Sequence, residues 1–172
     1  MSGGVSDVYA ENLYFFDSST AIKIKTARGR GGYVRNIYIS NVTLASVETA
    51  IKFNGNFSQH PDEFYDPNAL PVIERITVKD VIGDNIKVAG LLKGIEGDSF
   101  HGVCLLNITL NVTSESPWNC SYIQGYSVLV SPETCEPLKE SIYPKHSSDC
   151  FHLSNHLWSS GNQNRGSWLL SW

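Results

Sequence analysis

The densest group of charged side chains in this chain is basic and occupies residues 23–35. Five of the 13 Lys and Arg residues fall in this stretch, and no Asp or Glu does. Lys23 and Lys25 alternate with apolar neighbours, so both point away from the core if the segment is a strand. Arg28 follows in a Gly-rich turn that ends at Tyr33. Because ammonium and guanidinium groups bind carboxylates well and an aromatic ring can stack on a sugar face, the segment predicts a site for an anionic ligand. The alternative is a solvated basic strand and turn.

A repeated apolar template must position this segment. Apolar residues stand at offsets 0, 3, 5 and 8, with Asn or Asp at offset 7, in four stretches that begin at Val5, Val34, Ile73 and Phe100. The intervals between these stretches are 29, 39 and 27 residues. Short strands that recur at about 30 residues indicate a solenoid, and the longest interval accommodates a loop.

A second repeated element follows the first three stretches. Residues 21–25, 50–53 and 85–88 share an apolar–Lys–apolar core, and we interpret them as one short strand that recurs in each coil. The alternation has a period of two, and no long segment has the 3.6-residue period of an amphipathic helix. The sequence predicts an all-β fold, a right-handed single-stranded parallel β-helix with about four coils in residues 1–112. A β-sandwich is the alternative.

Several asparagines allow two interpretations. The template Asn or Asp is expected to stack amide on amide from coil to coil, with Asn41 and Asn107 pointing inward. Both also begin Asn-x-Ser/Thr sequons, as do three further asparagines. These three, Asn56, Asn111 and Asn119, are the better candidates for N-glycosylation.

The apolar template stops near residue 112. Residues 113–150 are polar and contain Pro and Cys, which predicts a cap or tail that covers the last coil. Residues 151–172 contain three Trp without a clear period and are expected to be irregular. An even number of cysteines without a Cys-x-x-Cys motif favours disulfides over zinc, with three possible pairings and free buried thiols as the alternative. The cysteines are Cys104, Cys120, Cys135 and Cys150.

Composition limits the possible functions. The formal net charge of −4 gives little support for nucleic-acid binding, and no apolar run reaches the length of a membrane span. The chain does not begin with a signal peptide, yet its sequons and its even number of cysteines are typical of secreted proteins. We expect no metal and no cofactor, since the histidines lack metal-ligand spacing.

The basic segment resembles a known family. Residues 21–26, the Gly-rich loop and residues 33–37 look like the Arg-Ile-Lys region of the polygalacturonases, which are family 28 glycoside hydrolases with the pectin-lyase-like β-helix fold. The resemblance covers residues 1 to about 150. Further stretches similar to the plant members are residues 2–5, 118–121 and 130–135.

The resemblance implies roles for individual residues. Members of the family cleave α-1,4-linked galacturonan with inversion, and their Arg and Lys bind a substrate carboxylate. Lys25 takes the position of the Lys, and Tyr33 that of a sugar-contacting Tyr. Lys23 stands where the family has Arg, and a Lys cannot form the bidentate contact that a guanidinium makes with a carboxylate.

The catalytic motifs of the family are missing from this sequence. Its acids lie in Asn-Thr-Asp and Asp-Asp motifs, followed by Gly-His-Gly, and the chain contains none of these. His101-Gly102 is not the Gly-His-Gly motif, because Phe100 precedes it instead of Gly. It also comes after the Lys-Ile-Lys segment, whereas the motif of the family comes before it. We therefore expect the C-terminal part of a polygalacturonase, with Met1 an internal residue of a longer protein, no catalytic residue and no hydrolysis by this chain alone.

Two other functions fit the same sequence. One is a non-catalytic β-helix that binds pectin or uronate, and the other is a truncated product without a function of its own. For the full-length protein we expect a secreted monomer in the cell wall, with a galacturonan polysaccharide as partner and neither nucleic acid nor membrane.

Overall fold

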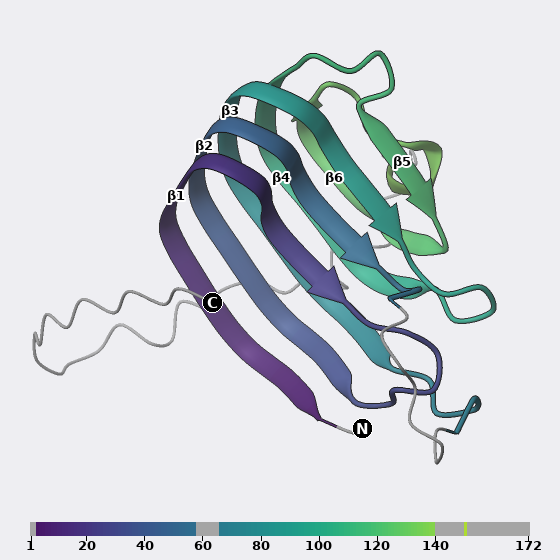
Figure 1. The fold of residues 1–172 in the computed structure, drawn as a ribbon. Coiled ribbons are helices and arrows are strands. Elements are labelled where there is room, and N and C mark those ends of the chain that lie inside the picture. Colours follow the sequence, from purple (N-terminus) through teal and green to yellow (C-terminus); the bar gives the residue numbers. More distant parts are fainter. Residues whose placement is uncertain (1–2, 58–65, 140–149, 151–172) are drawn as a thin grey trace, which may run out of the picture.

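The computed structural model describes residues 3–57, 66–139 and 150, and this part of the chain is a parallel β-helix (Figure 1). Every strand pairing within it is parallel, in one sheet with the order β1-β2-β3-β4-β6 and with β5 paired to β3. The predicted β-helix is confirmed. Its elements are β1 (Gly4–Lys25), β2 (Tyr33–Asn54), β3 (Val72–Lys93), β4 (Phe100–Val112), β5 (Trp118–Ser121), β6 (Ile123–Ser131) and the 3₁₀ turn η1 (Glu136–Leu138).

The apolar template lies in register from coil to coil. Val8 pairs with Ile37, Ile37 with Ile76, and Ile76 with Val103, as the template offsets predict. The exposed fraction falls from 37% at Val8 to 6% at Ile37 and 0% at the next two positions. The core is therefore a stack of equivalent side chains, each buried by the coils on both sides, and β1 has such a neighbour on one side only among the described strands. The four expected coils are β1, β2, β3 and, as the fourth, β4 together with β5.

The template Asn and Asp residues form a ladder at a corner of the coil. Asn12, Asn41, Asp80 and Asn107 have φ between 51° and 60°, a left-handed conformation that Asn and Asp tolerate better than most residues. The Nδ2 of Asn41 donates to Oδ1 of Asn12 at 2.5 Å, and the Nδ2 of Asn107 donates to Oδ1 of Asp80 at 2.6 Å. The ladder is confirmed, but the inward direction was wrong. Asn41 and Asn107 are exposed, because a left-handed residue interrupts the alternation of the strand.

A second ladder, which the template does not contain, lies at another corner. The Nδ2 of Asn36 donates to Oδ1 of Asp7 at 2.8 Å, and the Nε of Arg75 donates to Oδ1 of Asn36 at 2.6 Å. The hydrogen bond from Asn36 holds the pKa of Asp7 below its usual value. A third set of left-handed residues lies at equivalent positions of the first three coils: Asp17, Ser46 and Asn85.

The strand register corrects the match at residues 85–88. Lys23 pairs with Lys52, and Lys52 pairs with Leu91 rather than with Lys87. The match was wrong because Asn85 is a corner residue, whose Nδ2 donates to the Oγ of Ser46 at 3.1 Å. The apolar–Lys–apolar pattern therefore recurs four residues too early in the third coil.

Hydrogen-bonded stacking continues beyond residue 112, where the template stops. β6 pairs with β4 and begins a fifth coil, which places Leu129 directly after Asn107 in the corner ladder. Leu129 also has a positive φ, of 55°, and is 78% exposed. The division into coils, a cap of residues 113–150 and a tail stays a prediction, and residues 151–172 lie outside the described part.

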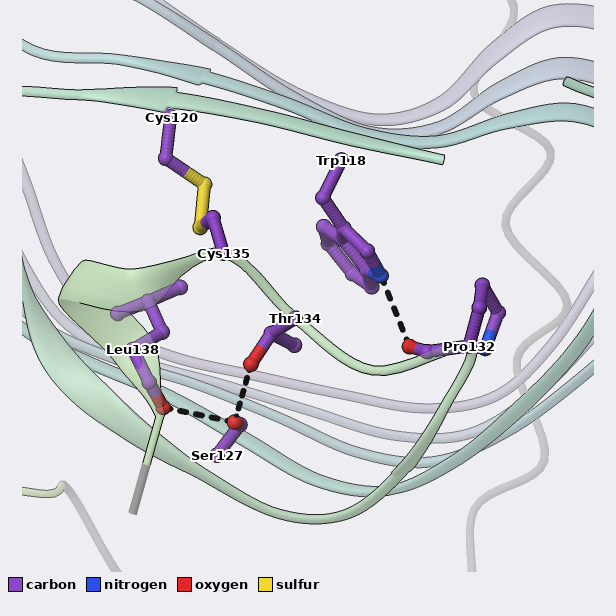
Figure 2. Close-up of a disulfide and its surroundings, with 7 residues drawn as sticks. All are labelled: Trp118, Cys120, Ser127, Pro132, Thr134, Cys135 and Leu138. Atoms are coloured by element: carbon purple, nitrogen blue, oxygen red, sulfur yellow. Dashed lines mark hydrogen bonds between the residues drawn. A yellow bond between two sulfur atoms is a disulfide. The ribbon is translucent and has the colours of Figure 1, made fainter. Parts of the chain in front are cut away.

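The segment after β6 folds back across the open end of the last coils (Figure 2). The indole Nε1 of Trp118 donates to the carbonyl of Pro132 at 3.0 Å. The Oγ of Ser127 donates to the carbonyl of Leu138 at 2.7 Å and lies 2.5 Å from the hydroxyl of Thr134. These contacts satisfy buried polar groups at the end of the solenoid, and Leu138 is fully buried there.

Two disulfides join this end to the stack, and of the three possible pairings the structure has one. Cys104 is bonded to Cys150, and Cys120 to Cys135, with Cα–Cα distances of 5.9 and 6.1 Å. All four cysteines are paired, so the alternative of free thiols is excluded.

The corner ladder predicts how replacements of Asn41 rank in stability. Asn41→Ala should lower the free energy of unfolding by about 1–3 kcal/mol, because Ala is strained at positive φ and the hydrogen bond to Asn12 is lost. Asn41→Gly loses only the hydrogen bond and should cost less, about 1 kcal/mol. Urea unfolding of protein made without glycosylation checks this order, and a Gly variant less stable than the Ala variant would contradict it.

Candidate anion-binding surface

The predicted basic segment occupies the end of β1 and the loop that follows it. Lys23 and Lys25 are exposed on the outer face of β1. Ile22, which precedes them in the strand, is buried in the core. The Nζ of Lys25 lies 4.3 Å from the centre of the Phe57 ring. Such a cation–π contact orients the ammonium group without neutralising it, so the charge stays available to a ligand.

Phe57 is a member of this surface that the sequence did not indicate. The guanidinium of Arg30 also lies over its ring, at 5.8 Å from the centroid. The N–H of Phe57 donates to the carbonyl of Thr26 at 2.9 Å, which ties the segment after β2 to the loop after β1. Only the Asn-Phe-Ser sequon marks this position in the sequence, and it gives no sign of a contact with a residue 32 positions earlier, Lys25.

Glycines shape the loop between β1 and β2. The N–H groups of Gly29 and Gly31 both donate to the carbonyl of Ala69 at 3.0 Å, so the loop is fixed to the segment before β3. Gly32 has a φ of 75°, and a Cβ at this position would lie 2.0 Å from the carbonyl oxygen of Gly3. The close approach of these two chain segments therefore requires glycine at position 32.

Arg28 extends from this loop to a loop of another coil. Its Nη2 donates to the carbonyl of Glu96, in the connection between β3 and β4, at 2.7 Å. Arg28 is exposed, and a guanidinium carries five N–H donors, so this contact leaves donors for a ligand. The contact holds the side chain in place, which reduces the entropy that a bound ligand would have to offset.

Tyr33 lies apart from the lysines, at the start of β2. Its ring packs against Gly4, where an added Cβ would lie 2.2 Å from Cζ of the ring. The guanidinium of Arg35 lies 4.6 Å from the ring centroid. Within the described part of the chain, no contact joins Tyr33 to Lys23 or Lys25, and its basic neighbour is Arg35.

Other kinds of site find no support in the described residues. Residues 3–57, 66–139 and 150 contain no group of three His, Cys, Asp or Glu that could hold a metal ion. In the same residues, no helix has the length and apolar character needed to cross a membrane. His101 is exposed, and its Nδ1 lies 3.1 Å from Oε1 of Gln124.

The predicted glycosylation sites are all on the surface. Asn56, Asn111 and Asn119 are exposed, although Nδ2 of Asn111 donates to Oδ1 of Asp84 at 2.9 Å. Exposure is necessary for glycosylation and does not demonstrate it, so the three sites stay predictions.

Fold and surface together define a parallel β-helix protein with a basic outer face on its first described coil. The family model for glycosyl hydrolases family 28 matches residues 2–135, and the chain belongs to this family. A curated relative, "Probable polygalacturonase" of Vitis vinifera, is 39% identical over 153 residues. The match covers 87% of this chain and 31% of the relative, so the chain spans less than a third of that protein's length. No solved structure matches the chain.

The geometry of the loop gives a prediction with a matched control. Gly32→Ala should lower the free energy of unfolding by about 1–3 kcal/mol, because the new Cβ meets the carbonyl of Gly3 at a strained φ. Gly3→Ala adds the same methyl group where no atom lies within 4 Å, and should change stability by less than about 0.5 kcal/mol. Thermal and urea unfolding compare the two, and equal losses would show that the close approach does not require glycine.

Proposed function

We propose that this chain is part of a polygalacturonase-like protein, binds galacturonan through its basic outer face and does not hydrolyse it alone. The observation that carries the proposal is the exposure of Lys23 and Lys25 on β1, with Arg28 fixed in the loop beside them. Galacturonan presents one carboxylate on each sugar residue, which matches a surface of fixed cations.

The electrostatics of the surface support an anionic ligand. Lys23 and Lys25 form no ion pair with any described residue, because each ion pair in this part of the chain involves Arg75, Lys79 or Lys139. Unpaired cations on one face raise the local concentration of anions and bind them more weakly as salt screens the charge.

A lack of catalytic carboxylates supports binding without hydrolysis. An inverting glycosidase needs a carboxylic acid and a carboxylate base roughly 6.5–9.5 Å apart, on opposite sides of the scissile bond. The columns of side chains that continue from Lys23 and Lys25 across β2, β3 and β5 contain no Asp or Glu. The family's acid motifs are also missing from the sequence. Lysines and arginines can hold the substrate but supply neither the acid nor the base.

The setting of the full-length protein is part of the proposal. We propose a secreted, monomeric glycoprotein of the cell wall that acts on pectin. Five sequons and two disulfides support an oxidising, extracellular environment.

Removal of a single cation tests the proposed surface. Lys25→Ala should weaken binding of polygalacturonate about tenfold or more, since a hydrogen bond to a charged group contributes about 1.5–3 kcal/mol. The affinity should also fall as salt is added. Affinity electrophoresis or isothermal titration calorimetry measures both effects.

Lys79→Ala is the matched control, because Lys79 is ion-paired to Asp80 at 3.6 Å and lies at another position of the coil. Its affinity should equal that of the unmodified chain. If both variants bound equally well, Lys25 would have no part in the site.

Hydrolysis is tested with the purified chain. It should release no reducing ends from polygalacturonate above the background of buffer, at any pH between about 4 and 7, because the acid–base pair is missing. A reducing-sugar assay checks this. Sustained release that is lost with Lys25→Ala would contradict the proposal.

A further inference from the structure

We propose that four lysines on three successive coils form a track that binds one extended polyuronate chain lying parallel to the axis of the β-helix. We call Lys23, Lys25, Lys52 and Lys93 the lysine track. The inference rests on the proposed function and adds to it the direction of the ligand, its minimum length and two further binding residues.

The strand register places the four lysines in two neighbouring columns. One column runs from Lys23 to Lys52 and continues through Leu91 to Asn119. The other column runs from Lys25 through Asn54 to Lys93 and ends at Ser121. The two columns are separated by one inward-pointing residue in each strand. The track therefore shifts from one column to the other as it passes from β1 to β3.

All four lysines lie on the outer side of these strands. The intervening column of Ile24, Phe53 and Leu92 belongs to the core, and Phe53 and Leu92 are at most 1% exposed. Because neighbouring residues of a strand point to opposite faces, the lysines on either side of this column point outward. Lys23, Lys25 and Lys93 are exposed, and Lys52 is half-buried.

The four lysines of the track carry positive charges that no acidic side chain among the described residues neutralises. Lys23 and Lys52 are direct neighbours in a parallel pair, where strands lie about 4.8 Å apart, so their charges repel each other. Neither column contains an acidic residue, and none of the four lysines forms an ion pair with a described residue. Each lysine is therefore available to an anion, and an anion shared between neighbours would relieve the repulsion.

The spacing of the track selects a polymer. From β1 to β3 the track covers two strand spacings, about 10 Å, and each coil on the way contributes at least one lysine. A ligand with one carboxylate per sugar can contact all three coils only if it runs along the axis. A disaccharide has two carboxylates, and the two lysines of β1 can bind both of them without Lys52 or Lys93. The columns end in the uncharged Asn119 and Ser121, so the track stops at β5.

The test compares oligogalacturonates of two lengths and two double variants of the whole 172-residue chain. Lys52→Ala/Lys93→Ala removes the part of the track beyond β1. Lys79→Ala/Lys87→Ala removes the same charge from exposed or ion-paired positions of β3 outside both columns. Circular dichroism and intact disulfides establish that each variant folds, and titration calorimetry with digalacturonate and octagalacturonate gives the affinities.

We expect Lys52→Ala/Lys93→Ala to weaken octagalacturonate binding at least about tenfold and to leave digalacturonate binding within about twofold. The control pair should bind both ligands like the unmodified chain. Equal effects of the two double variants on the octamer, or no effect of either, would overturn the track and leave the surface of β1 as the binding site. Octamer binding no stronger than that of polyglutamate of matched length would overturn the assignment to a uronate.

A failure of the proposed function gives a different result. In that case the unmodified chain binds neither oligogalacturonate, and Lys23→Ala/Lys25→Ala makes no difference to either ligand. That outcome would overturn the track together with the surface on which it rests.

Discussion

Parallel stacking of equivalent residues from coil to coil is the constraint on which this structure depends. Residues at equivalent positions of successive coils share one environment, so the positions of the apolar template are apolar in every coil and a corner position must accept a left-handed conformation. Val8, Ile37 and Ile76 meet the first condition, and Asn12, Asn41 and Asp80 meet the second. β1, β2 and β3 pair without a register shift, and the extra residues of the longest interval lie between β2 and β3. β4 pairs with both of its neighbours through a register shift of one residue.

The same constraint decides what could be predicted from the sequence. An apolar template that repeats at fixed offsets predicted the fold and the register of the core, because burial depends on the period alone. The prediction that Asn41 and Asn107 point inward missed the effect of a left-handed residue, which reverses the alternation of the strand. The mark of this reversal in the template is the step of three between the apolar offsets 5 and 8. Lys87 was matched to the wrong position for a similar reason. The residues around it resemble those around Lys23, but the corner at Asn85 places them earlier in the coil.

The basic surface was predictable in its charges and less so in its contacts. Lys23 and Lys25 alternate with apolar residues, and this pattern alone places their side chains on the outer face of the strand. The positions of Arg28 and Phe57 depend on loops of other coils. Arg28 is held by a carbonyl 68 residues away, at Glu96, and no local pattern records such a contact. The resemblance to the polygalacturonases is confirmed by the family match, whereas the roles that it implies for Lys23, Lys25 and Tyr33 are matters for experiment.

The two ends of the described stack differ in chemistry. At the C-terminal end the corner ladder stops at Leu129, whose side chain has neither an amide nor a carboxylate to receive the next Asn. The segment that contains Leu138 covers the core there. The exposed edge of β1 has no such terminator among the described residues. The described stack is therefore chemically asymmetric along its axis: a segment of the same chain covers the core beyond β6, whereas no described strand pairs with the outer edge of β1.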